Sequence, residues 1–395
     1  MLLELCFLFF LSFSAAQKVI DLKSFRGNNV KNAIDNPGPY SMFVSAASDS
    51  PQYLNRVSVV SEDGSTQTMY EMIARKMFPT TGQLLPFPIQ KSAYIVSNLT
   101  DDQMNTLTGF LFVSSSQQFA DNNFYVIAVD RTQKLSWTGL GAINTTVLFL
   151  NSFFSTTPWF SSTINLWAQP DDAVNYVYSG FPTDTIEKSN SQIFSNPFPT
   201  TKGLTYISHV EQFSLSLQTF YIKSYKGVEF TIAPGYYDFD NKATSAYTTT
   251  GLYMKAINQP DKNVVIYTVR GDNYKNGTVG ANVVGNVPDG AEVSVGAWDG
   301  NPYTSTPLHP VDQILGWSTQ GIGQNFQIAS KNAEAGEFYV QYYIIAGPQS
   351  PSGSTPSTLS TRLTNPTTSR PIITTTKSST TVKLLISLLI PFFFC

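Results

Sequence analysis

Apolar and polar residues alternate along most of the chain, which is the pattern of half-buried β-strands. Turn residues such as Glu62-Asp63-Gly64 and Pro288-Asp289-Gly290 separate the alternating runs. The strands that we expect cover residues 40–44, 57–60, 124–129, 213–217, 220–222, 228–232, 264–269, 292–295 and 338–345. Many short strands at short intervals predict a mainly β protein built of antiparallel β-sandwiches.

Two segments depart from this alternation and predict short helical insertions. Met69, Ile73 and Met77 recur at helical spacing, which predicts a helix over 65–77 with Ser65 as its N-cap. Thr100 and Gln103 have the spacing of a capping box, which predicts a helix of about one or two turns after Thr100. Such insertions leave the β class of the chain unchanged.

Composition divides the chain into regions. Residues 184–203 are rich in Ser, Asn, Pro and Thr and predict a linker between two sandwich domains, 17–183 and 204–347. Ser, Thr and Pro dominate residues 348–381, where few apolar side chains offset the entropy of ordering. We therefore expect a disordered stalk there, of the kind that carries O-linked glycans.

Both ends of the chain resemble processing signals. Residues 1–16 form a short apolar run that ends in small residues, which predicts a signal peptide. Residues 382–395 form a second short apolar run after a polar spacer, the pattern of a glycosylphosphatidylinositol (GPI) attachment signal. Ser369 and Ser378 are the candidate attachment residues. A tail-anchored helix is the alternative, but the run is short and contains Pro391.

Charge and cysteine usage exclude several classes of protein. Charged residues make up 13% of the chain, the formal net charge is −3, and Lys and Arg are scattered singly, so no nucleic-acid partner is expected. Cys6 and Cys395 lie in the two terminal runs, so we expect a mature protein without a disulfide. Three N-glycosylation sequons begin at Asn98, Asn144 and Asn276, which fits an exported protein.

Sequence motifs for catalysis are scarce. His209 and His309 are the only histidines, and the chain has neither an H-E-x-x-H nor a G-x-S-x-G motif. A secreted hydrolase would need a Ser-His-acid geometry assembled in space around one of these histidines, or a cluster of carboxylates, in a deep pocket. We therefore expect that the protein is not an enzyme.

Acidic clusters are the candidates for a metal site. Asp238 and Asp240 alternate at a strand end and could supply oxygen ligands to Ca²⁺, as could Asp101-Asp102 and Asp171-Asp172. The alternative is that they are solvated turns, because Asp and Asn suit turn geometry. No other cofactor is expected.

Large aromatic residues beside turn residues are the candidate ligand-binding groups. A ring next to Asp or Asn can stack on a sugar while its polar neighbours bind hydroxyls. The alternative is that these rings fill the ends of the sandwiches. The candidates are Trp159, Trp298, Asp299, Tyr303 and Trp317. Arg270-Gly271-Asp272 follows an expected strand and is either an adhesive tripeptide or an ordinary turn.

The overall organisation resembles a known group of proteins. The signal peptide, the segments 40–55 (YSMFVSAASDSPQYLN) and 233–237 (APGYY), the Ser/Thr-rich stalk and the apolar tail together resemble nematode secreted and surface proteins of the CUB-like group. This resemblance implies a β-sandwich of jelly-roll or CUB-like type, display at the cell surface or in membrane rafts, and a part in innate immunity.

The sequence therefore predicts a GPI-anchored surface glycoprotein that acts by binding. The ligand would be a glycan, a microbial surface or another surface protein. A secreted hydrolase and a structural coat protein are the alternatives, the second of which would have neither a pocket nor an exposed aromatic surface.

Overall fold

The fold was obtained as a computed structural model. It describes residues 17–46, 51–74, 76–78, 83–138, 143–154, 159–183, 192–200, 203–236, 240–268, 277–298, 321–323 and 325–347. The chain divides into a compact unit, Met1–Pro351, and a second unit, Ser352–Cys395, which lies outside the described residues together with the expected signal peptide and GPI tail. The expected mainly β, antiparallel class is confirmed by the strand pairing within the first unit.

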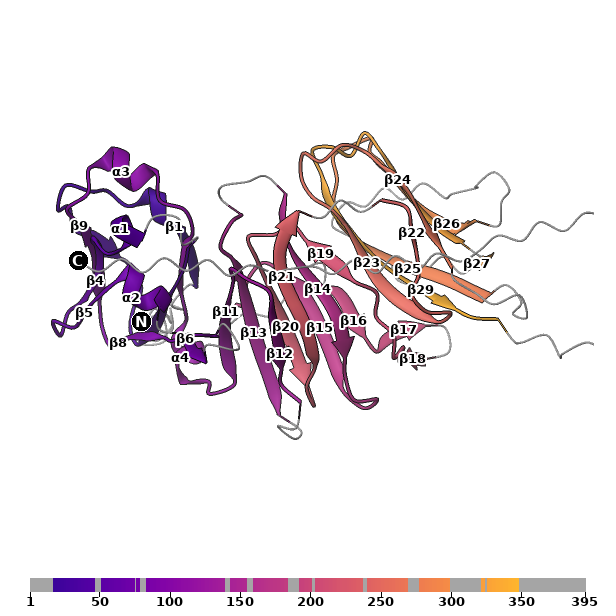
Figure 1. The fold of residues 1–395 in the computed structure, drawn as a ribbon, viewed down its shortest axis with the longest axis horizontal. Coiled ribbons are helices and arrows are strands. Elements are labelled where there is room, and N and C mark those ends of the chain that lie inside the picture. The colour runs from indigo at the N-terminus through magenta and orange to yellow at the C-terminus, as the bar shows by residue number, and fades with distance from the viewer. Residues whose placement is uncertain are drawn as a thin grey trace, which may run out of the picture. The chain divides into compact units, whose positions relative to one another are not determined.

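Two four-stranded sheets form the N-terminal part of the first unit (Figure 1). The first has the order β1 (Lys18–Asp21), β10 (Phe110–Val113), β3 (Tyr40–Ser45), β8 (Phe87–Ile89). The second has the order β2 (Asn32–Ile34), β9 (Ala93–Ser97), β4 (Val57–Ser61), β5 (Thr66–Thr68).

The central part contains a seven-stranded sheet, a four-stranded sheet and a hairpin. The seven-stranded sheet has the order β16 (Gln192–Asn196), β15 (Val174–Ser179), β20 (Thr219–Tyr225), β13 (Asn144–Asn151), β11 (Phe124–Val129), β7 (Gln83–Leu84), β6 (Lys76–Phe78). The four-stranded sheet has the order β12 (Gln133–Ser136), β21 (Glu229–Tyr236), β14 (Phe160–Ala168), β19 (Phe213–Leu215), and the hairpin pairs β17 (Phe198–Thr200) with β18 (Gly203–Thr205).

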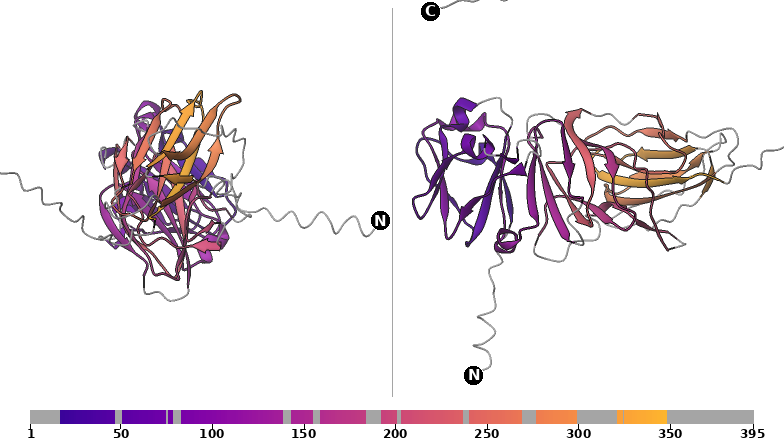
Figure 2. Two further views of the ribbon diagram at one scale, coloured as in Figure 1. Left: turned by 90° about the vertical axis from the view of Figure 1, so that its right-hand side faces the viewer. Right: turned by 60° about the horizontal axis from the view of Figure 1, so that its bottom comes forward.

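Two further four-stranded sheets form the C-terminal part (Figure 2). One has the order β22 (Lys242–Ala243), β24 (Asn263–Tyr267), β28 (Asn325–Lys331), β26 (Glu292–Trp298). The other has the order β23 (Thr249–Lys255), β29 (Glu337–Ile345), β25 (Gly277–Asn286), β27 (Gly321–Gly323). Of the ladders between named strands in the described residues, β11·β13 and β22·β24 are parallel and the rest are antiparallel.

Short helices connect some of these strands. They are η1 (Leu22–Ser24), α1 (Pro51–Leu54), α2 (Met69–Ala74), α3 (Asp101–Asn105) and α4 (Ser116–Ala120). The capping box at Thr100 and Gln103 is confirmed at the start of α3. The start expected at Ser65 is wrong, because residues 66–68 pair with β4 and α2 begins at Met69. There the Glu71 N–H donates to Thr68 Oγ1 and the Thr68 N–H donates to Glu71 Oε2.

Hydrophobic clusters join neighbouring sheets, so several strands are buried on both faces. On β3, Tyr40, Met42 and Val44 pack against the second N-terminal sheet, while Phe43 packs against the seven-stranded sheet. Strands β23 and β29 likewise contribute side chains to two clusters. This two-sided burial explains why all residues of β3, YSMFVS, are buried.

The strand pairing crosses the linker that the sequence predicts at 184–203. Strand β16 lies within that segment and joins β15 and β20 in one sheet, with Ile193 and Phe194 buried. The side-chain amide of Gln341 on β29 accepts from the Ser195 N–H (2.9 Å) and donates to the Ser195 carbonyl (2.7 Å). Residues 192–200 therefore form strands and not a linker, because their apolar side chains are buried and Ser195 and Asn196 are hydrogen-bonded to other segments.

None of the helices in the described ranges is long and apolar enough to cross a membrane. The stalk, 348–381, lies outside those ranges.

Candidate functional site

Aromatic side chains gather at one end of the central four-stranded sheet. Phe160, the first residue of β14, faces Tyr236, the last residue of β21, across the ladder. Their ring centroids are 5.1 Å apart in an edge-to-face arrangement, and Phe153 lies 5.1 Å from Phe160 on its other side. Phe153 and Phe160 are half-buried, whereas Tyr236 is 67% exposed. Two rings therefore close the end of the sandwich and support a third that faces solvent.

Trp159 precedes this pair and has an unusual backbone. Its φ angle is 63°, a left-handed conformation that a bulky residue adopts only when its surroundings impose it. The hydroxyls of Ser161 and Ser216 each lie 3.1 Å from the Trp159 carbonyl oxygen and 2.6 Å from each other, so one can donate to the carbonyl while the other donates to its neighbour. The indole Nε1–H donates to the carbonyl of Ile257 at 3.0 Å, and 39% of the residue remains exposed.

We call Phe153, Trp159, Phe160 and Tyr236 the aromatic platform. Rings held by neighbouring rings and by hydrogen bonds lose little conformational freedom when a ligand binds, which is what makes aromatic residues effective anchors. The side chains that hold the platform, such as Ser161 and Ser216, are uncharged. The platform is therefore suited to a ligand with an apolar face and neutral polar groups, such as a sugar.

The platform includes one of the five residues that the sequence singled out, Trp159. Trp298 ends β26, but its side chain lies outside the described residues, as do Asp299, Tyr303 and Trp317. Sequence reasoning missed Tyr236, because only the β14·β21 register brings it beside Phe160, the residue after Trp159. The available signal was the aromatic run that contains Tyr236, which follows a turn-forming Pro234-Gly235 pair.

The acidic candidates are engaged in other contacts where they are described. Asp240 is exposed and its Oδ1 lies 3.6 Å from the Lys262 ammonium, while Asp238 lies outside the described residues. Asp172 pairs with Lys226, whose hydrogen bond holds the pKa of that carboxyl below its ordinary value. Asp101 Oδ1 accepts from the Gly27 N–H at 2.7 Å. No group of three or more metal-ligating side chains occurs within the described ranges.

The structure brings His209 together with a serine and a glutamate. Ser245 Oγ lies 2.6 Å from His209 Nε2 and 2.8 Å from Glu211 Oε2. Glu211 is buried and also accepts from the Ser245 N–H at 2.8 Å and from Thr249 Oγ1 at 3.0 Å. Burial lowers the pKa of the nearby Lys242 ammonium, and the Glu211 carboxylate opposes that shift. His309 and Arg270-Gly271-Asp272 lie outside the described residues.

The direction of these hydrogen bonds differs from that of a catalytic triad. A serine hydroxyl has one proton, and Ser245 donates it to the Glu211 carboxylate. In this arrangement His209 Nε2 donates to Ser245 Oγ. The hydrogen bonds of the cluster then satisfy the buried Glu211 carboxylate.

Removing that carboxylate is expected to destabilise the protein. Glu211→Ala leaves the Ser245 N–H, the Ser245 hydroxyl and the Thr249 hydroxyl without their acceptor, which we expect to lower the free energy of unfolding by about 3 kcal/mol. Glu211→Gln keeps one acceptor oxygen and should cost about half as much. Glu292→Ala, which removes a partly exposed partner of Lys331, is the matched control and should cost less than ~0.5 kcal/mol. Equal losses for Glu211→Ala and Glu292→Ala in urea unfolding would contradict this role.

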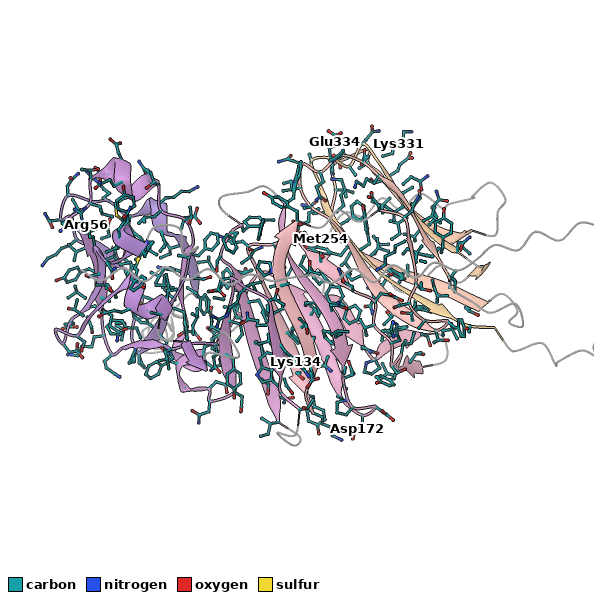
Figure 3. The ribbon with its side chains drawn as sticks, in the orientation of Figure 1. Arg56, Lys134, Asp172, Met254, Lys331 and Glu334 are labelled. Carbon is teal, nitrogen blue, oxygen red and sulfur yellow. The ribbon has the colours of Figure 1, made fainter. Side chains whose placement is uncertain are left out.

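Two of the three sequons lie on the described surface. Asn98 is exposed, and its side-chain oxygen accepts from Arg56 Nε at 2.7 Å; Arg56 is labelled in Figure 3. Asn144 begins β13 and is exposed. Asn276 lies outside the described residues, as do Ser369 and Ser378.

Comparisons with solved structures give matches of low identity. The CUB1-EGF-CUB2 domains of rat MASP-1 are 7% identical and cover 55% of this chain and 99% of their own, with a TM-score of 0.19. The corresponding region of human MASP-1/3 is 8% identical over 54% of this chain and 99% of its own, with a TM-score of 0.18. A triple jelly-roll protein of an archaeal virus turret is 11% identical over 85% of this chain and 91% of its own, with a TM-score of 0.19. With scores this low, the fold class rests on the strand pairing alone.

A search of curated proteins finds no match. Comparison with family models gives one that covers most of the chain, from residue 37 to residue 393, and that describes a transmembrane glycoprotein. The match covers every described strand from β3 onward, the aromatic platform and both described sequons. The chain therefore belongs to this family of transmembrane glycoproteins.

Proposed function

We propose that this protein is a cell-surface glycoprotein that binds neutral glycans through the aromatic platform. The observation that carries the proposal is the ring of Tyr236, which is 67% exposed and packs edge-to-face against Phe160. Covering a solvent-facing ring with the apolar face of a ligand removes apolar surface from water, which is favourable. Family membership supports a glycoprotein at a membrane, which is where extracellular glycans are met.

The proposed ligand is neutral for two reasons. Charged residues are scarce in the chain as a whole, at 13%, and the side chains that hold Trp159 are serines. Anionic glycans bind through Arg and Lys, which form charge-assisted hydrogen bonds, and neither type holds the platform. Stacking on Tyr236 and Trp159, with hydroxyls bonded to nearby backbone and serine groups, requires no charge on the ligand. The test is glycan binding by the protein with and without the Tyr236 ring.

The same proposal includes the manner of membrane attachment and the biological setting. Residues 382–395 would be replaced by a GPI lipid at Ser369 or Ser378, and the stalk at 348–381 would hold the sandwiches away from the bilayer. Asn98 and Asn144 would carry N-linked glycans, since both are exposed. A role in innate immune defence follows from the CUB-like resemblance and would use the glycan-binding activity.

If a GPI lipid anchors the protein, reagents that cleave the lipid anchor but not the polypeptide should release the protein from cells. Treating intact cells with phosphatidylinositol-specific phospholipase C, or with nitrous acid, which cleaves the anchor even when its inositol is acylated, should move most of the protein into the medium. A variant with Leu388→Asp and Leu389→Asp, which interrupts the apolar tail, should be secreted without treatment. Retention of the native protein on cells after both treatments would show a membrane-spanning helix in place of the lipid.

A further inference from the structure

A cavity of about 380 Å³ lies in the described residues away from the aromatic platform. Residues of β3, α4, β7 and β11 line it. Phe43, Leu84 and Phe124 are among its apolar lining, and Ser41, Gln83 and Asn122 among its polar lining. Its volume falls in the lower part of the range of ~300–1,000 Å³ that small-molecule sites occupy.

A largely buried serine contributes a hydroxyl to the cavity lining. Ser41 is 6% exposed, and its backbone is satisfied by Ser114, because the Ser41 N–H donates to Ser114 Oγ (2.8 Å) and its carbonyl accepts from the Ser114 N–H (2.9 Å). The Ser41 hydroxyl forms no hydrogen bond within the part of the chain that the structure describes. A ligand hydroxyl that bonds to Ser41 would therefore form a hydrogen bond without breaking one inside the protein.

The walls of the cavity supply flat apolar surface. Phe43 and Phe124 both pack near Phe112, with ring centroids 6.1 Å and 6.2 Å from it. Phe43 and Phe112 are buried and Phe124 is half-buried, so this group of rings is fixed before any ligand enters. The C–H face of a sugar ring packs well on such a surface.

The mouth of the cavity is polar but carries no positive charge. Gln83 is half-buried and Asn122 is exposed, and their amide groups can both donate and accept hydrogen bonds. Asp121 is the sole charged side chain in the lining, and its Oδ1 accepts from the Asn123 N–H at 2.8 Å. Because none of the described lining residues is Lys, Arg or His, an anionic ligand would meet repulsion from Asp121 without compensation from them.

We propose that this cavity is a binding site for a neutral saccharide of about one or two rings. One face of a ring packs on Phe43 and Phe124, a hydroxyl bonds to Ser41, and further hydroxyls bond to Gln83, Asn122 and Asp121. The site is separate from the aromatic platform, so either one can fail without the other.

The test is titration of the purified protein with three kinds of probe, followed by ligand-detected NMR and calorimetry. The neutral probes are methyl glucopyranoside, methyl galactopyranoside and N-acetylglucosamine, the anionic probe is glucuronate, and the apolar probe is indole. We expect saturable binding of at least one neutral sugar. Asn122→Trp, which places a large side chain at the exposed mouth, should weaken that binding at least tenfold. Gln117→Trp, on the exposed side of α4, should leave it unchanged.

A second variant tests the depth of the site without blocking its mouth. Ser41→Ala removes one neutral hydrogen bond and should weaken sugar binding about three- to tenfold, whereas Tyr236→Ala on the platform should have no effect. Absence of saturable binding by the neutral sugars overturns the proposal. So does binding that Asn122→Trp and Ser41→Ala leave unchanged, or binding of glucuronate or indole alone.

Discussion

Replacing Gly109 with alanine is expected to lower the free energy of unfolding by at least about 3 kcal/mol. Gly109 has a φ of 107°, which an L-residue adopts only with strain, and it lies just before β10. An added Cβ would lie 2.2 Å from the Ser45 carbonyl oxygen and 2.5 Å from Ala46 Cα, so the ends of β3 and β10 would have to separate. Both strands contribute to two hydrophobic clusters, so the disturbance reaches both faces of their sheet.

The matched control is Gly64→Ala. Gly64 also has a positive φ, 86°, but no atom lies within 4 Å of the added Cβ. Only the conformational cost should remain, about 1 kcal/mol. Urea unfolding of the two variants compares the values directly, and a Gly109→Ala loss no larger than that of Gly64→Ala would mean that β3 and β10 do not approach as described.

Much of the secondary structure follows from local patterns in the sequence. Alternation predicts β4, β11 and β29, and the Thr100–Gln103 spacing predicts the start of α3, because these features depend on residues close together in the chain. The helix start near residue 65 could not be placed in this way, since pairing of β5 with β4 competes with helix formation. The linker at 184–203 was misassigned in part for the same reason. Ser195 is polar, but it is bonded to Gln341, a residue 146 positions away.

The candidate site was predictable only in part. Trp159 stands out in the sequence because Pro158 precedes it and Phe160 follows it. The hydrogen-bond partners of Trp159 cannot be recognised in this way, because Ser216 and Ile257 come from distant segments of the chain. No sequence motif indicates the cavity lined by α4, because its residues come from β3, β7, α4 and β11. Sites of this kind depend on the tertiary fold and not on spacing along the chain.

Removing the ring of Tyr236 is expected to weaken glycan binding by at least about tenfold. Truncating a well-supported tyrosine at a binding surface typically costs about 1–2 kcal/mol or more, and 1.4 kcal/mol corresponds to a factor of ten in the dissociation constant. Tyr236 is a cleaner probe than Trp159, because its ring is largely exposed and the Trp159 indole also bonds to Ile257. Tyr236→Ala should therefore leave the free energy of unfolding within about 0.5 kcal/mol of the native value.

The matched control for Tyr236→Ala is Tyr267→Ala. Tyr267 ends β24 and is 42% exposed, so its removal also takes an aromatic ring from the surface, but away from the platform. If the Tyr236 ring does not contact the glycan, Tyr236→Ala and Tyr267→Ala should change the dissociation constant by the same factor.

Neutral-glycan binding through the aromatic platform is best tested by the dissociation constant of the protein for a neutral glycan selected on a glycan array. For native protein we predict saturable binding that Tyr236→Ala weakens at least about tenfold and that Tyr267→Ala changes by no more than about twofold. Failure of the native protein to bind any neutral glycan, or equal binding by the native protein and Tyr236→Ala, would contradict glycan binding through the platform.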